Sequence, residues 1–210
     1  MSEAKSSYHH GDLRQALIDG AIAEIAAGDP SQLSLRAIAR RVGVSHAAPY
    51  RHFADKEALL AAVAEEGFCG LTAALTASFT TTEPQTLQQL TAGGHAYVTY
   101  ALHHPHHYRV MFSSCPGPPE RYPELATAGQ AAFMVLVEAI IAGQAAGRVR
   151  AGDPMQLAQV TWSLVHGIAM LTIDGYLQSP DAQQVAELTA LAMRSLVEGL
   201  QTPVNSAVVQ

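Results

Sequence analysis

The sequence predicts an all-α protein, with a small N-terminal domain of three helices and a larger helical body. Apolar residues recur at intervals of three and four through every long segment, and no segment alternates apolar and polar residues as a half-buried strand would. The 210 residues are 49% hydrophobic and 14% charged, which favours a sizeable core over disorder. Glycine, proline and aspartate separate the segments at positions typical of helix ends.

A first helix is expected from about Asp12 to Ala26, after a polar arm of residues 1–10 that we expect to be mobile. One face of this helix carries the apolar residues Leu13, Leu17, Ala21 and Ile25. The run at 28–30, Gly-Asp-Pro, is expected to end it, because glycine and proline terminate helices.

The most informative run covers residues 35–60, which read LRAIARRVGVSHAAPYRHFADKEALL. Its first eight residues predict a helix, which Gly43 stops. Ser45 is suited to cap a short second helix that ends at Phe53, and Asp55 is suited to cap a third helix that starts at the next residue. Two short helices joined by a tight turn containing glycine are typical of a helix-turn-helix.

The charges of this run suit a nucleic acid. From Arg36 to Lys56 it holds five basic residues and a single acid, Asp55. Such an excess favours contact with a phosphate backbone. The run therefore predicts a DNA-binding head, with its basic side chains at Arg36, Arg40, Arg41, Arg51 and Lys56.

The second helix of this run is the expected recognition helix. Its N-terminal residues His46 and Ala47, with Tyr50 one turn further on, would face the major groove. Pro49 lacks an N–H group, so this helix should be short and partly 3₁₀ near its start.

Two helices and a short third one should follow in the first half of the body. Residues Lys56–Phe79 predict one long helix that spans roughly 35 Å at 1.5 Å per residue. The run 80–84 should break it, since it ends in proline. The next helix should reach about His103, where Pro105 forces a break, and a short helix should then run to Phe112.

The second half of the body predicts a proline-rich loop and three helices. The loop at 113–123, SSCPGPPERYP, holds four prolines and should lack regular structure. A long apolar helix is expected over Leu125–Ala146, ended by the glycine that follows. Asp153 and the proline after it should start a helix that reaches Gln178. The run at 179–181 should start a last helix that ends near Gly199, before a loose tail.

Four runs in the head resemble the N-terminal domain of the TetR family of transcriptional regulators. They fall in register over about fifty residues, at Ser34–Ala39, Val42–Ser45, Tyr50–Phe53 and Lys56–Leu60. The head departs from the broader family at Pro49, where that family more often has leucine. Three further runs resemble a subgroup whose C-terminal domain carries a Trp-His-Gly signature: Tyr8–Arg14, Tyr108–Phe112, and Trp162, His166 and Gly167 in TWSLVHG.

The resemblance implies roles for residues in the head. The residues that match Tyr50, His52 and Lys56 contact phosphates, and Ser34 matches a position that binds a backbone phosphate at a helix N-terminus. The expected DNA-binding residues are therefore Ser34, Arg36, Ser45, His46, Ala47, Tyr50, Arg51, His52 and Lys56.

The resemblance also implies a domain order and a mode of action. Residues 1–57 would form the arm and DNA-binding domain, and residues 58–210 a helical effector-binding and dimerisation domain. The last two helices, about Asp153–Gln178 and Asp181–Leu200, would pair with those of a second subunit. A homodimer would then bind palindromic operator DNA, usually as a repressor, until an unidentified small-molecule effector moves the long Lys56–Phe79 helix. Residues small enough for close packing at the interface are Gly167, Ala169, Ala186, Ala190 and Ala192.

The helix from Asp153 is apolar nearly all round, which predicts deep burial. Trp162 and His166 lie one turn apart on one face, which Met170 and Asp174 continue. A buried histidine and a buried aspartate need partners. The histidine could be a core residue bonded to a neighbouring helix, with Gly167 allowing close helix approach.

Alternatively, Trp162, His166 and Met170 could line an effector pocket, because pockets mix apolar walls with few polar groups. Such a pocket would favour a largely hydrophobic ligand. Further lining candidates, or plain core residues, are Tyr97, Tyr100, Met111, Phe112, Phe133 and Met134.

Residues 103–107 place four histidines around one proline. His103, His104, His106 and His107 could bind a transition metal. However, Pro105 prevents one continuous helix from presenting the outer pair four residues apart, so a solvated helix corner is the stronger interpretation.

Two other functional classes compete with the regulator. An all-α metal-dependent enzyme would use these histidines, but the sequence has no HExxH spacing, no Ser-His-Asp arrangement and no glycine-rich phosphate loop. A helical adaptor that binds only proteins would not need the basic head. We therefore expect neither enzymatic activity nor a cofactor.

Charge and cysteine content fit a regulator in the cytoplasm. The net charge is −6, yet residues 1–57 hold seven basic and seven acidic side chains, so the negative excess lies in the body. The low charged fraction suggests that a partner subunit covers apolar surface. Cys69 and Cys115 form no CxxC pair, which suits a reducing compartment, and we expect no signal peptide and no transmembrane helix.

Overall fold

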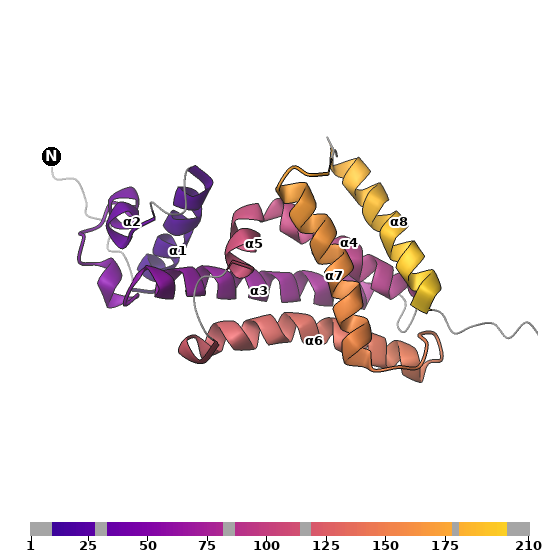
Figure 1. Cartoon of the computed structure of the whole chain (residues 1–210). Coiled ribbons are helices and arrows are strands. Elements are labelled where there is room, and N and C mark those ends of the chain that lie inside the picture. The colour runs from indigo at the N-terminus through magenta and orange to yellow at the C-terminus, as the bar shows by residue number, and fades with distance from the viewer. Residues whose placement is uncertain (1–9, 28–32, 82–86, 114–118, 178–180, 201–210) are drawn as a thin grey trace, which may run out of the picture. The chain divides into compact units, whose positions relative to one another are not determined.

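The computed structural model describes residues 10–27, 33–81, 87–113, 119–177 and 181–200. Within these ranges the chain forms eight α-helices and two 3₁₀ helices, and no β-strand (Figure 1). The prediction of an all-α protein is therefore confirmed. The expected N-terminal arm, the expected break at 28–30, most of the break at 80–84, the start of the last helix at 179–180 and the tail fall outside the described residues.

The chain divides into two compact units. Unit 1 comprises Met1–Gly67 and His106–Thr127, and unit 2 comprises Phe68–Pro105 and Ala128–Gln210. The chain crosses from one unit to the other inside two helices and at the start of a third. Each unit is described by itself.

Unit 1 holds the N-terminal helices and the short helices that return to them. They are α1 (His10–Ala27), α2 (Leu35–Val42), the 3₁₀ helix η2 (Pro49–Arg51), the first part of α3 (Lys56–Thr81), α5 (Pro105–Met111) from its second residue, and the 3₁₀ helix η3 (Pro119–Arg121). Its most deeply buried large side chains are Leu17, Ile18, Ile38, Leu59, Val63 and Tyr108.

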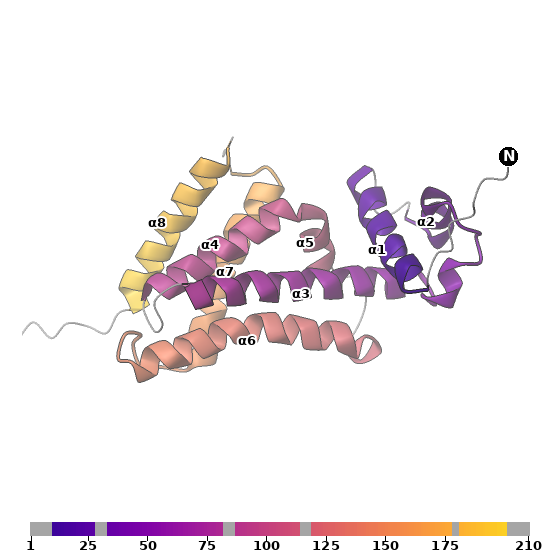
Figure 2. The ribbon, with the colours of Figure 1, turned by 180° about the vertical axis from the view of Figure 1, so that it is seen from behind.

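Unit 2 holds four helices and the second part of α3. They are α4 (Leu87–His103), α6 (Pro123–Ala145) from residue 128, α7 (Pro154–Ile173) and α8 (Ala182–Leu200). Helix α4 packs against both α7 and α8, and the three lie together in both views (Figures 1 and 2). A Cβ atom on Gly94 of α4 would lie 2.6 Å from the Met193 sulfur of α8, so this glycine permits the close approach of the two helices.

Two of the helix starts predicted from capping residues are confirmed. The Ala58 N–H donates to the Asp55 carboxylate at 2.8 Å at the start of α3. Asp153 caps α7 in the same way. A further cap that was not predicted lies at the start of α2, where the Ala37 N–H donates to the Ser34 hydroxyl at 3.2 Å. The stop after α2 is also confirmed, because Gly43 adopts the left-handed conformation at φ 77°.

The second helix of the helix-turn-helix is shorter than predicted. The expected α-helix over Ser45–Phe53 is a turn at residues 46–48 followed by the three-residue η2, whose cap position is Ala48 without a side-chain bond. The capping role predicted for Ser45 is therefore wrong; its carbonyl instead accepts the Ala48 N–H at 3.0 Å. Pro49 explains the short helix, because it supplies no N–H to an α-helical ladder.

Two other boundaries differ from the predictions. Helix α7 ends at Ile173 and not at Gln178, because Asp174 is its C-cap and Gly175 turns the chain at φ 75°. The proline-rich loop is not wholly irregular, since η3 forms within its described part and α6 begins at Pro123, its last residue, and not at Leu125.

Helix α7 is not buried all round. Its buried face includes Thr161, Val165 and Ile168, whereas Val160 is 56% exposed and Leu171 is 45% exposed. The predicted burial of Asp174 is also wrong, because that side chain is exposed beyond the end of the helix. One chain therefore leaves an apolar face of α7 in contact with solvent.

Two helices are long and apolar enough to cross a membrane by length and composition alone. They are α3, over Lys56–Thr80, and α6, over Pro123–Ala145. Half of the apolar window in α3 is buried within the fold. A buried helix in the core of a helical domain has the same composition, so this observation is weak evidence for a membrane span.

Candidate DNA-binding surface and effector pocket

The residues predicted to bind DNA lie mainly on the surface of the head. Seven of the nine are exposed and two, His52 and Lys56, are half-buried. Tyr50 is 53% exposed, although it directly follows the fully buried Pro49. The exposed seven are Ser34, Arg36, Ser45, His46, Ala47, Tyr50 and Arg51.

Buried side chains on either side of Tyr50 fix this surface. Pro49 is among the fully buried residues and Phe53 is 4% exposed. The Arg14 guanidinium of α1 lies 5.5 Å from the centre of the Phe53 ring. The Phe53 N–H also donates to the Pro49 carbonyl at 2.9 Å. The backbone of η2 is thus anchored to the core while its outward side chains face solvent.

One basic residue of this run is engaged within the head. The Arg41 Nε–H donates to the Glu24 carboxylate of α1 at 3.0 Å. This bond lowers the pKa of Glu24 and raises the pKa of Arg41. Arg41 therefore ties α2 to α1, although its side chain, like that of Arg36 on the same helix, is exposed.

Three of the predicted effector residues meet through hydrogen bonds in unit 2. The Trp162 Nε1–H of α7 donates to the Tyr97 hydroxyl of α4 at 3.0 Å, and that hydroxyl lies 3.1 Å from Nδ1 of His166. A fourth, Phe133 of α6, meets the Trp162 ring edge-on at 6.0 Å. We call these four residues the Tyr97 cluster.

The Trp162 bond has a fixed direction, because the indole N–H can only donate and the Tyr97 oxygen accepts it. The Tyr97 hydroxyl keeps one hydrogen and a second lone pair, so it is the donor to Nδ1 of His166 in one imidazole tautomer and the acceptor in the other. Burial lowers the pKa of His166 and favours the neutral ring.

The remaining effector candidates are divided between the two units. Met111 and Phe112 belong to unit 1, where a Cβ on Gly67 would meet the Met111 sulfur at 2.5 Å. Met134 and Met170 are half-buried in unit 2.

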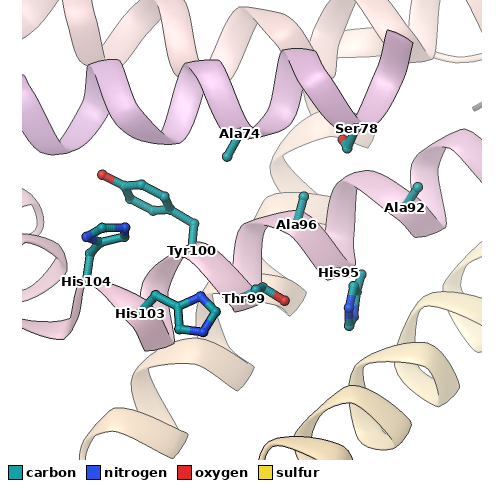
Figure 3. Close-up of a pocket in the computed structure, with 9 residues that line it drawn as sticks. All are labelled: Ala74, Ser78, Ala92, His95, Ala96, Thr99, Tyr100, His103 and His104. Carbon is teal, nitrogen blue, oxygen red and sulfur yellow. The ribbon is translucent and has the colours of Figure 1, made fainter. Parts of the chain in front are cut away.

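Tyr100 lines a separate groove between α3 and α4 in unit 2 (Figure 3). The groove has a volume of about 450 Å³. The His104 ring stacks near Tyr100 with the ring centres 4.5 Å apart. Small side chains leave the space open, and three histidines stand along it; the lining residues are Ala74, Ser78, Ala92, His95, Ala96, Thr99, Tyr100, His103 and His104.

The histidine run at 103–107 is a corner between two helices, as predicted. Helix α4 ends at His103 and α5 begins at Pro105. Among the described residues, no group of three His, Cys, Asp or Glu side chains is placed to hold a metal ion. His107 instead faces Glu66 of α3, with Nε2 and Oε1 3.7 Å apart.

Reasoning from the sequence did not find two connections that join distant segments. Tyr97 was one lining candidate among several, and its position between Trp162 and His166 was not predicted. Arg121 was not singled out, although its guanidinium reaches Asp55 in the head. Partners separated by more than sixty residues leave no spacing signal in the sequence.

Replacing Tyr97 with phenylalanine should destabilise the protein by about 1 kcal/mol, because the half-buried polar groups of Trp162 and His166 lose their shared partner. The free energy of unfolding in urea, followed by far-UV circular dichroism, measures this loss. The matched control is Tyr176→Phe, which removes the same hydroxyl from a side chain that is 76% exposed. Equal stabilities of the two variants would contradict the structural role of the Tyr97 hydroxyl.

Comparison with known proteins agrees with the geometry of both parts. Residues 17–63 match the model of the bacterial regulatory proteins of the tetR family. Residues 90–196 match the tetracyclin repressor-like C-terminal domain. Curated proteins gave no significant match.

Solved structures resemble the whole chain. A protein of unknown function from Rhodococcus sp. RHA1 is 36% identical, with a TM-score of 0.83, and the match covers 94% of this chain and 100% of that one. A tetR-family regulatory protein from Rhodococcus RHA1 has 22% identity and a TM-score of 0.72, over 95% and 100% of the two chains. A TetR-family transcription regulator from Marinobacter aquaeolei VT8 has 21% identity and a TM-score of 0.69, over 90% and 96%.

The last two structures support the fold alone, and the family matches supply the assignment. The C-terminal match covers 107 of the 210 residues, and the N-terminal match includes the helix-turn-helix. The family consists of transcription regulators and not of enzymes. The chain belongs to the TetR family of bacterial transcriptional regulators.

Proposed function

We propose that this regulator binds a palindromic operator as a homodimer, represses transcription there, and is released by a largely hydrophobic effector in the cytoplasm. Residues 1–57 would bind DNA, and residues 58–210 would dimerise and hold the effector, in the subgroup with a Trp-His-Gly C-terminal domain. The observation that supports DNA binding best is the exposed polar and basic surface around η2, held in place by buried Pro49 and Phe53.

The head residues divide into two roles. His46 and Ala47 are exposed on the turn before η2 and would read base edges in the major groove. Ser34, Tyr50 and Lys56 would bind phosphates and set the register of the head on the duplex. Arg36 and Arg51 add positive charge beside them. Pro49 limits the reading element to a turn and one 3₁₀ helix, so few bases would be read by each head.

Lys56→Ala should weaken DNA binding by a similar factor on every sequence and lower the salt slope of log Kd by about 1, because one phosphate contact is lost. The probe is the duplex that the wild-type protein enriches from a random pool, measured by fluorescence anisotropy at several salt concentrations. Arg148→Ala, which removes an exposed cation from unit 2, is the control and should leave the slope unchanged.

His46→Ala tests the second role on the same duplexes. It should relax the preference at particular base pairs and leave the salt slope nearly intact. An unchanged slope for Lys56→Ala would remove that residue from the phosphate contacts, and an unchanged preference for His46→Ala would remove base reading.

The proposed dimer interface is the apolar face of α7 and α8. Val160 and Leu171 of α7 and Leu191 of α8 are 45% to 56% exposed in one chain. The two helices pack against each other in unit 2 (Figures 1 and 2). Exposed large apolar residues on adjacent helices indicate an interaction site. Gly167 would allow a second subunit to approach the backbone of α7 closely. A Cβ at this position would meet nothing within 4 Å in a single chain, so packing within the chain does not require a glycine there.

Leu191→Glu should convert the dimer to a monomer, because a carboxylate would be buried in an apolar interface. The matched control is Ile141→Glu on α6, which introduces the same charge at a residue that is 47% exposed, against 55% for Leu191. Sedimentation velocity at micromolar concentration measures the mass of each species. A wild-type monomer, or a Leu191→Glu dimer, would contradict this interface.

The Tyr97 cluster is the proposed effector contact. It combines aromatic walls from α6 and α7 with one buried hydroxyl and one neutral imidazole. A ligand that accepts the His166 N–H or displaces the Tyr97 hydroxyl from Nδ1 would exchange one hydrogen bond for another. Such a site favours an apolar ligand with one or two polar atoms.

Binding at the Tyr97 cluster should change the fluorescence of Trp162, because it is the single tryptophan of the chain. A panel of apolar carboxylic acids and aromatic compounds is titrated first against this emission and then against the protein–DNA complex. His166→Ala should weaken both responses to the same extent, whereas the control His103→Ala in the groove should weaken neither. A compound that releases DNA equally from wild type and His166→Ala would move the effector site away from this cluster.

A further inference from the structure

Arg121 joins η3 to the start of α3 within unit 1. Its Nη2–H donates to the Asp55 carboxylate at 2.7 Å, and its Nη1–H donates to the Glu57 carboxylate at 2.5 Å. The guanidinium also lies 5.3 Å from the centre of the Tyr122 ring. Two carboxylates and an aromatic face thus hold one cation, which fits the planar donor geometry of arginine.

The Asp55 carboxylate serves two partners at once. One oxygen accepts the Ala58 N–H at 2.8 Å and caps α3, and the other accepts Arg121. A carboxylate at a helix N-terminus is attracted to the positive end of the helix dipole. The cap that starts α3 therefore also places a negative charge beside Lys56.

Without Arg121, the charges at the start of α3 would not favour the binding of a phosphate. Asp55, Lys56 and Glu57 are consecutive and leave one excess negative charge. A phosphate approaching Lys56 would meet both carboxylates, and the repulsion acts over about 10 Å at 0.1 M salt. The Arg121 guanidinium cancels this excess while remaining bound to both acids.

We propose that Arg121 is a positioning residue for operator binding, which acts by neutralising and orienting Asp55 and Glu57 beside the phosphate contact of Lys56. The inference rests on the proposed role of the head in binding operator DNA. It adds Arg121, which belongs to unit 1 but lies outside the helix-turn-helix in the sequence.

The contribution should appear in DNA binding more than in stability. The side chains of Arg121, Asp55 and Glu57 are 48%, 42% and 46% exposed, and exposed ion pairs contribute little to folding. The approach of a polyanion is different, because it senses the summed charge of the surface.

The experiment compares Arg121→Ala with Arg148→Ala, which removes the same charge from unit 2. The probe is the duplex enriched from a random pool by the wild-type protein. Arg121→Ala should weaken binding by about two- to five-fold at low salt, and the loss should shrink as salt is raised. Arg148→Ala should bind as the wild type does.

Compensation separates the electrostatic role from a structural one. Adding Glu57→Gln to Arg121→Ala removes the excess negative charge and should restore most of the affinity, although the tie between η3 and α3 stays broken. Arg121→Lys keeps the charge and should retain most of the affinity. Thermal unfolding of each variant verifies that the head is folded.

Three results would overturn the proposal: wild-type affinity in Arg121→Ala, equal losses in Arg121→Ala and Arg148→Ala, or a loss that Glu57→Gln does not repair. If the wild-type protein enriches no duplex at all, the proposed operator binding itself fails. If the wild-type protein and Arg121→Ala bind the enriched duplex equally well, only the role of Arg121 is refuted.

Discussion

The arrangement depends on one uninterrupted helix, α3, whose first turn is fixed by the Asp55 carboxylate. Its 26 residues belong to the head as far as Gly67 and to the body from Phe68 onward. Because every backbone bond along an α-helix reinforces the next, α3 resists bending and carries a displacement along its length. Close packing against neighbouring helices also restrains α3. A Cβ at Gly67 would lie 2.5 Å from a side chain of α5, and a Cβ at Gly70 would lie 2.5 Å from a side chain of α4. The proposed effector mechanism would use that stiffness.

Local chemistry explains what the sequence predicted well. Capping by Asp55 and the left-handed turn at Gly43 depend on a few adjacent residues, so the end of α2 and the start of α3 could be predicted from spacing. The limit of the same reasoning appears at the end of α7. Tyr176 and Leu177 continue the apolar pattern beyond the helix, but the conformation of Gly175 ends it earlier than the pattern implies.

Contacts between distant segments explain what the sequence could not predict. Trp162 and Tyr97 are 65 residues apart, and Arg121 and Asp55 are 66 residues apart. Helical periodicity identifies the face on which each side chain lies, but it does not identify which helix covers that face. The apolar pattern of α7 illustrates the difference, because it predicted burial all round. In one chain Val160 and Leu171 stay exposed, and the second subunit of the proposed dimer would cover them.

Two helices run without a break from the body into the unit that holds the candidate DNA-binding surface. Helix α3 is the first. Helix α6 is the second, because its first turn belongs to unit 1 and follows Arg121 by two residues, while the rest of the helix carries Phe133 of the Tyr97 cluster in unit 2. A ligand that displaces Phe133 would therefore act on a helix whose other end adjoins the ion pairs with Asp55 and Glu57. Under the proposed effector mechanism, a preference of the ligand for one position of α6 would alter both the start of α3 and the charge beside Lys56. The cap of α3 and the charge balance of the head would then depend on the same carboxylate, that of Asp55.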